Sequence, residues 1–181
     1  FDADLQGTSK ILADRLGFSV EGFLVPDENY ENRGMGVITT PNKEIPPKEL
    51  LGKVSAATNG PLRYCAGAGN KISRIAIVGG SGSSFIDAAL DAGVDALITA
   101  DITYHTFHAV QGKLMLIDPG HYEMEQFVPL GLAKLLVDTF DSETIIYNKV
   151  LISKVRTNQV NYYPDTEKYI EMQNNYLLTN H

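Results

Sequence analysis

His121 and Glu125 lie four residues apart in the run KLMLIDPGHYEMEQF (113–127), and their side chains could bind a metal ion. The apolar residues 114–117 predict a buried strand, and Asp118-Pro119-Gly120 ends it before a helix that begins at His121. Side chains four residues apart on a helix share one face. They would lie at the carboxyl end of a strand, where open α/β sheets place ligands. The same spacing also occurs between ordinary neighbours on a helix surface, so both interpretations stay open.

A second pair of polar residues follows the next strand upstream, in the run ADITYHTFHAV (100–110). Asp101 comes directly after predicted strand 96–99, so we expect it at the same sheet edge as His121. We predict catalytic roles for both Asp101 and His105, with His105 as a general acid or base. The alternative for Asp101 is an N-cap of the short helix that follows. His108 is expected to have a packing role.

The glycine-serine loop 79–84 (GGSGSS) separates a predicted strand from a predicted helix. Successive backbone N–H groups in Gly80, Ser81, Gly82 and Ser83 could bind an anion such as phosphate. The loop lacks both the dinucleotide-binding pattern and the Gly-Lys-Ser/Thr of a P-loop. A tight turn that lets helix and strand pack closely explains the glycines equally well.

Three other residues are expected to be structural. Asp118 is predicted to hydrogen-bond to the backbone of its own turn. Glu123 is expected to point to solvent, and Cys65 to have a buried apolar role.

The bulk composition narrows the class of protein. Among 181 residues, 22 are acidic and 15 basic, and the formal charge of −7 argues against nucleic acid as a partner. A single cysteine excludes an intrachain disulfide and fits the cytoplasm, which we predict as the location. No apolar stretch is long enough for a membrane span, and no signal peptide is visible.

The elements that must position these residues alternate between strand and helix from residue 73 onward. Alternation of this kind predicts an α/β fold with a mainly parallel or mixed sheet and helices on both faces. Pro129 predicts a break near residue 128 in the last helix, 121–140. The expected strands are 23–25, 36–39, 62–65, 74–78, 96–99, 114–117 and 150–155, and the expected helices are 8–16, 46–54, 85–92, 103–111 and 121–140.

The start of the chain indicates a fragment of a longer protein, because it begins at Phe1 without an initiator methionine. We assign 1–70 to the remainder of a first lobe and 71–160 to a C-terminal α/β lobe that carries the metal-ligand motif. The aromatic tail, 161–181, is expected to pack on the body or on a neighbouring subunit.

Four segments resemble the NGG-one-interacting-factor-three-like (Nif-three-like) family, in family order and across most of the chain. They are FDADLQGTSKILADRLGF (1–18), RIAIVGGSGSSFI (74–86), ITADITYH (98–105) and LIDPGHYEMEQF (116–127). Members bind two metal ions and are often named GTP cyclohydrolase I type 2 homologues. The family fold is two related α/β lobes assembled into a hexameric ring.

The resemblance implies a set of metal ligands. Asp2 matches the aspartate that ends the family's His-Thr-x-x-Asp stretch, and His121 and Glu125 match its His-x-x-x-Glu pair. Asp101 and His105 match its Gly-Asp-x-x-Tyr-His stretch, in which Ala100 replaces the glycine. Ser9 stands where the family usually has Asn, and Pro119 where it often has Ala. The family's paired histidines lie upstream and are absent from this chain.

The leading hypothesis is the C-terminal part of a dinuclear-metal-dependent hydrolase that acts on a small, nucleotide-like molecule. Its two divalent ions would be Zn²⁺, Mn²⁺ or Fe²⁺, which suit mixed nitrogen and oxygen ligands. One alternative is a non-enzymatic, metal-binding regulator or adaptor that forms a ring of identical subunits. Another is a nucleotide-binding module that uses the glycine loop without metal.

Overall fold

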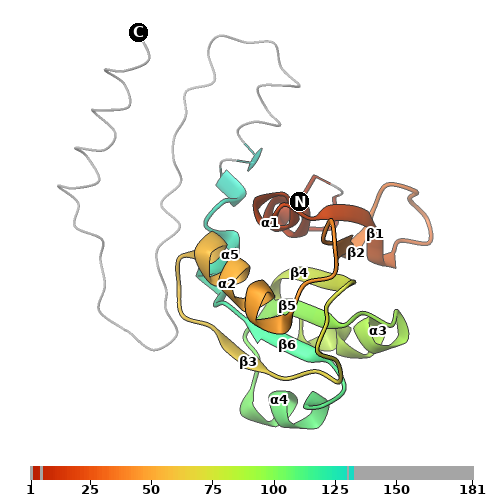
Figure 1. Cartoon of the computed structure of the whole chain (residues 1–181). Coiled ribbons are helices and arrows are strands. Elements are labelled where there is room, and N and C mark those ends of the chain that lie inside the picture. Colours follow the sequence, from red (N-terminus) through yellow and green to blue (C-terminus); the bar gives the residue numbers. More distant parts are fainter. Residues whose placement is uncertain (1, 5, 130, 133–181) are drawn as a thin grey trace, which may run out of the picture. The chain divides into compact units, whose positions relative to one another are not determined.

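In the residues that the computed structural model describes (2–4, 6–129 and 131–132), six strands form one mixed sheet. The strands are β1 (Ser19–Pro26), β2 (Gly34–Thr40), β3 (Arg63–Cys65), β4 (Ile75–Ser81), β5 (Ala96–Ala100) and β6 (Met115–Asp118). Their order across the sheet is β1-β2-β4-β5-β6-β3 (Figure 1). Strands from both sides of residue 70 therefore share one sheet.

The central strands β4, β5 and β6 are parallel, so their carboxyl ends meet at one edge of the sheet. Ile77 of β4 pairs with Ile98 of β5, which pairs in turn with Ile117 of β6. The outer strands are antiparallel: β1 to β2, β2 to β4, and β3 to β6. The prediction of a mixed α/β sheet is confirmed.

Helices cover both faces of the sheet, as predicted (Figure 1). They are α1 (Thr8–Leu16), α2 (Pro47–Thr58), α3 (Ile86–Asp91), α4 (Tyr104–Val110) and α5 (His121–Glu125). Residues of α1, α2 and α5 pack in one hydrophobic cluster, and residues of α3 and α4 in another. Residues 75–78, 96–98 and 115–117 of the three parallel strands are apolar because both faces of these strands are covered.

Strand β4 shows how one sequence supplies two cores. Ile75 and Ile77 belong to the cluster with α1, whereas Ala76 and Val78 belong to the cluster with α3. Successive side chains of a strand point to opposite faces, and all four are buried. Complete burial of an isoleucine side chain stabilises a fold by roughly 1.5–3 kcal/mol, so the packing of β4 contributes to the stability of the sheet.

The end of strand β4 differs from the sequence-based expectation. Strand β4 continues through Ser81, so Gly79, Gly80 and Ser81 lie in the strand rather than in a loop. A bulge separates Ile77 from the pairing of Ser81 with Ala100, and Gly80 adopts a positive φ of 65° there. Extra residues of a bulge often take such conformations, which glycine tolerates best.

The predicted break in the last helix is confirmed. Helix α5 ends at Glu125, a turn occupies residues 126–127, and helical structure resumes at 128. Pro129 has no N–H to donate to the Glu125 carbonyl, and its ring crowds that turn.

The rest of the last helix (133–140), the predicted strand 150–155 and the aromatic tail 161–181 lie outside the described residues. Among the helices that are described, none has the length and apolar character that crossing a membrane requires.

Candidate functional site

The predicted metal pair lies at the edge where the parallel strands end. His121 is the first residue of α5, directly after the turn Asp118-Pro119-Gly120 that ends β6, and Glu125 is the last. The Nε2 atom of His121 lies 3.2 Å from Oε1 of Glu125. The two side chains therefore converge on one face of the helix, as their spacing predicted.

Asp101 contacts the other side of the same imidazole. Its Oδ2 atom lies 2.6 Å from Nδ1 of His121. The tautomer of the imidazole decides which of these two atoms donates the hydrogen bond. The N-cap of α4 is Thr103, whose hydroxyl accepts a hydrogen bond from the Thr106 backbone N–H. Asp101 is therefore not the helix cap, and the predicted edge position beside His121 is confirmed.

The His121 imidazole lies between two acidic groups, and its pKa responds to both. Partial burial lowers the pKa of His121. The hydrogen bond to Asp101 and the negative charges of Glu125 and Asp101 outweigh this, so the pKa lies above the ordinary value of 6.5. The site therefore favours a cation, either a proton or a metal ion.

Asp2 is connected to this edge of the sheet through Thr8 and Gly79. The Thr8 hydroxyl donates a 2.8 Å hydrogen bond to Asp2 Oδ1. The methyl group of Thr8 packs so closely on Gly79 that a Cβ at residue 79 would lie 2.5 Å from it. Gly79 in turn precedes Gly80, which contacts His121 and Glu125. Among the described residues, no three His, Cys, Asp or Glu side chains are arranged to hold a metal. The role of Asp2 as a ligand stays a prediction.

The glycine segment, residues 79–84, borders the His121–Glu125 pair directly. A Cβ on residue 80 would lie 2.6 Å from Glu125 Oε1 and 3.1 Å from His121 Nε2. A Cβ on residue 82 would lie 2.4 Å from the Thr99 hydroxyl, which donates a hydrogen bond to the Gly80 carbonyl. A larger side chain at residue 80 or 82 would clash with these atoms, which explains the glycine at both positions. Ser81 and Ser83 are exposed, and anion binding by this segment stays a prediction.

Ser9 also contacts this segment. Its hydroxyl oxygen accepts a 3.1 Å hydrogen bond from the Gly79 backbone N–H. The replacement noted from the sequence thus occurs beside the glycine segment, where the side chain at residue 9 satisfies a backbone donor of β4.

His105 is exposed on α4, where its ring makes an edge-to-face contact with Tyr104 at 5.6 Å between centroids. The contacts described for this chain do not include one between His105 and His121. The predicted acid–base role therefore stays a prediction that mutation has to test. His108, expected to pack, makes a similar contact with Tyr104 at 6.2 Å.

Asp118 connects the turns that carry the site. Its Oδ1 accepts the Gly120 N–H at 2.9 Å, which confirms the predicted turn, and its Oδ2 accepts the Ile102 N–H at 3.0 Å. Asp118 is 2% exposed and forms an ion pair with the Arg63 guanidinium of β3. The contribution of Arg63 was missed in the sequence, since no local pattern links residues 55 positions apart.

Glu123 corrects one sequence-based expectation. It was expected to point to solvent but is only 8% exposed. Its carboxylate packs against Gly120, where a Cβ would lie 2.4 Å from Oε2, and its Cγ packs against Gly60. Gly60, distant in the sequence, and Gly120, three residues away, make room for this side chain on the inward face of α5.

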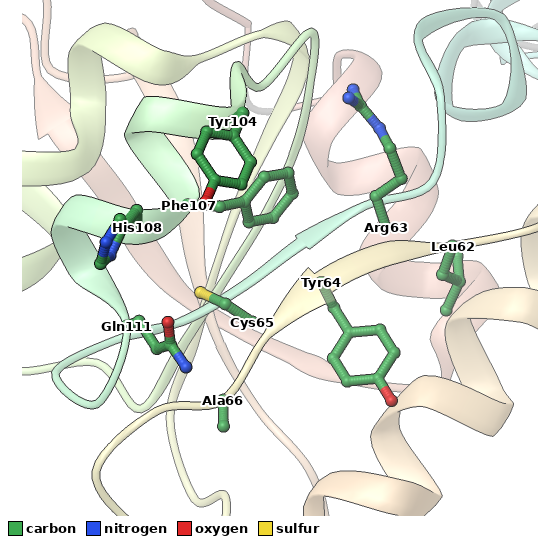
Figure 2. A pocket seen from close by; sticks show the side chains of 9 residues that line it. All are labelled: Leu62, Arg63, Tyr64, Cys65, Ala66, Tyr104, Phe107, His108 and Gln111. Carbon is green, nitrogen blue, oxygen red and sulfur yellow. The ribbon is translucent and has the colours of Figure 1, made fainter.

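A hollow of about 680 Å³ lies between β3 and α4. Figure 2 shows Cys65, Tyr104 and Phe107 gathered on one side of β3, with Tyr64 directed to the other. The half-buried Cys65 packs with the α3–α4 cluster, in line with its predicted apolar role. The nine lining residues include no acidic side chain.

Two donor atoms at the strand edge, His121 Nε2 and Glu125 Oε1, have the separation of two ligands of one divalent metal ion. Two ligands bound at about 2.0–2.2 Å to one ion stand roughly 3 Å apart, close to the separation of His121 Nε2 and Glu125 Oε1. Metal-binding histidines usually donate their other ring N–H to a carboxylate, and Asp101 lies within hydrogen-bonding distance of Nδ1 of His121.

The sequence profile of the family Duf34/NIF3 (NGG1p interacting factor 3) matches residues 1–159. This chain belongs to the Duf34/NIF3 family. The resemblance read from four sequence segments is thereby confirmed, and the family includes proteins of known structure.

Relatives are longer than this chain. The chain is 32% identical over 130 residues to a Nostoc protein named GTP cyclohydrolase 1 type 2 homolog, covering 70% of this chain and 49% of that protein. A Clostridium perfringens protein of the same name is 28% identical over 146 residues, covering 79% and 55%. The chain thus spans about half the length of these curated relatives.

Solved structures have the same fold. A Bacillus cereus protein related to NIF3 matches with a TM-score of 0.57 and 27% identity, covering 64% of this chain and 32% of that one. A Staphylococcus aureus hypothetical protein matches with a TM-score of 0.71 and 21% identity, covering 90% and 66%.

Proposed function

We propose that this chain is part of a metal-dependent hydrolase of the Duf34/NIF3 family, acting on a nucleotide-like substrate. The observation that carries the proposal is the position of His121 between Asp101 and Glu125, at 2.6 and 3.2 Å. The names of the curated relatives, GTP cyclohydrolase 1 type 2 homologs, support GTP as the first substrate to test.

His121 and Glu125 would hold the ion, with Asp2 as the further ligand that the resemblance implies. A divalent ion there would lower the pKa of a bound water and polarise the substrate. Asp101 contacts Nδ1 of His121, on the other side of the ring from Nε2 and Glu125. Gly80 leaves these two side chains the space they occupy. His105 is the candidate acid or base, and Gly80–Ser83 the candidate binding segment for substrate phosphate.

GTP turnover is the experiment that tests this function. Metal-loaded chain, or the longer protein if the chain alone retains no metal, is compared with Glu125→Gln and with Glu49→Gln. Glu49 is an exposed carboxylate in the first turn of α2 and serves as the matched control. We expect turnover in the wild type and the control, and its loss in Glu125→Gln. Retained metal without turnover in the wild type would contradict hydrolysis of GTP and favour the adaptor alternative.

The hexameric ring implied by the resemblance is part of the same proposal. The molar mass in solution, measured by light scattering, tests it directly. A mass of six subunits supports the ring, and a monomer contradicts it.

A further inference from the structure

Asp101 has a backbone conformation that nothing in its local structure requires. Its φ angle is 58°, and among the described non-glycine residues only Asn59, at 53°, shares a positive φ. Asn59 is the C-cap of α2, a position where the left-handed conformation is common. Asp101 instead follows the last residue of β5 and caps no helix. A left-handed conformation costs a residue with a side chain free energy, and such strain is often found at functional sites.

The turn that contains Asp101 is fixed on both sides. Ala100, the residue before it, pairs with Ser81 in the sheet. Ile102, the residue after it, donates its backbone N–H to the buried carboxylate of Asp118. Thr103 then caps α4 through its hydroxyl. These contacts hold the backbone on either side of Asp101, whose Oδ2 lies 2.6 Å from Nδ1 of His121.

The contact with Asp101 affects which ring nitrogen of His121 is available to bind a metal ion. Neutral imidazole has one N–H and one lone pair, and a hydrogen bond at one nitrogen decides which atom has which. We propose that Asp101 is a positioning residue that holds His121 in the tautomer protonated at Nδ1, so that Nε2 is the metal-binding atom. This inference rests on the proposed function and adds the ligating atom and the residue that selects it.

The tautomer can be measured without any metal. Nitrogen-15 spectra of the metal-free chain, recorded at a pH high enough for the spectra themselves to show a neutral His121 ring, distinguish the two ring nitrogens. We expect the Nδ1-protonated form of His121 in the wild type. In Asp101→Gly this preference should disappear, while the spectrum of His108 stays unchanged. A wild-type His121 protonated at Nε2, or a tautomer unaffected by Asp101→Gly, would overturn the inference.

Two variants separate positioning from a merely structural role. Glycine adopts the φ of residue 101 without strain, so Asp101→Gly should keep or raise the melting temperature. Its zinc affinity should nevertheless fall about tenfold to a hundredfold, the range seen when a carboxylate behind a metal-binding histidine is removed. Asp101→Asn retains an oxygen that can accept from Nδ1, so it should keep the tautomer and recover part of that affinity. Unchanged zinc affinity in Asp101→Gly, or a loss matched by a fall in melting temperature, would contradict the inference.

Comparing His121→Ala with Asp101→Gly distinguishes failure of this inference from failure of the proposed function. If His121→Ala retains wild-type zinc, the metal site itself is wrong, whatever the tautomer. If His121→Ala loses zinc while Asp101→Gly keeps wild-type affinity and tautomer, the site is right and the role of Asp101 is wrong.

Discussion

Gly80 and Glu125 approach each other so closely that a methyl group at residue 80 would lie 2.6 Å from the Glu125 Oε1 atom. The same methyl group would lie 3.1 Å from Nε2 of His121. Both atoms are at the ends of flexible side chains, which can move away. A side chain at residue 80 would thus disturb the site more than the fold.

Gly80→Ala tests this relationship against Gly93→Ala. The two glycines have nearly the same φ, 65° and 64°, but nothing lies within 4 Å of a Cβ at residue 93. Each substitution should destabilise the chain by roughly 1–2 kcal/mol through backbone strain, measured by chemical denaturation. Only Gly80→Ala should also weaken zinc binding, measured by calorimetry. Equal zinc affinities in the two variants would mean that Gly80 has no part in the site.

Asp118→Ala is expected to destabilise the chain by about 3 kcal/mol, because it leaves the backbone N–H groups of Ile102 and Gly120 without their acceptor, whereas the exposed Arg63 guanidinium is solvated by water. Asp27→Ala is the matched control. Asp27 is exposed, and its Oδ1 accepts a hydrogen bond from the N–H two residues ahead, as Asp118 Oδ1 does. The control should cost less than about 1 kcal/mol. Similar free energies of unfolding for both variants would show that the link to Ile102 and Arg63 contributes nothing.

Lowering the pH should stabilise the metal-free fold through His121 but weaken the binding of zinc. The pKa of His121 is raised in the fold, so its contribution to stability is fully present below the unfolded pKa near 6.5. It is lost as pH rises through the folded pKa. Metal binding needs the neutral imidazole, so zinc affinity should fall about tenfold per pH unit below that pKa. In His121→Ala the pH-dependent step in stability should disappear. If it persists there, another group causes it.

His105→Ala tests the catalytic prediction that the structure leaves open. A general acid or base typically contributes about a hundredfold to ten-thousandfold to kcat, so a loss of that size with unchanged zinc content is expected. His108→Ala is the control, since His108 lies on the same helix and makes the same kind of contact with Tyr104. Wild-type kcat in His105→Ala would remove His105 from the mechanism.

Local signals were enough to predict much of this fold. Helix α1 begins and ends as predicted because its apolar spacing stops at Gly17, a left-handed C-cap with φ of 71°. The pairing of His121 with Glu125 follows from helix geometry, and the position of Asp101 follows from the alternation of strand and helix. Each depends on residues close together in the sequence.

Other features depend on residues far apart in the sequence, and no local pattern encodes them. The left-handed Asp101 is fixed by a hydrogen bond between Ile102 and Asp118. Glu123 is buried because Gly60, on the loop after α2, leaves space for its side chain. The extension of β4 through Ser81 depends on pairing with Ala100, which only the assembled sheet provides.

Metal content of purified chain, measured by elemental analysis after dialysis, tests the central claim most directly. The wild type is compared with His121→Ala and with His108→Ala, a control outside the site. Bound Zn²⁺, Mn²⁺ or Fe²⁺ in the wild type and in His108→Ala, and its loss in His121→Ala, is the predicted result. Wild-type metal content in His121→Ala would contradict the account.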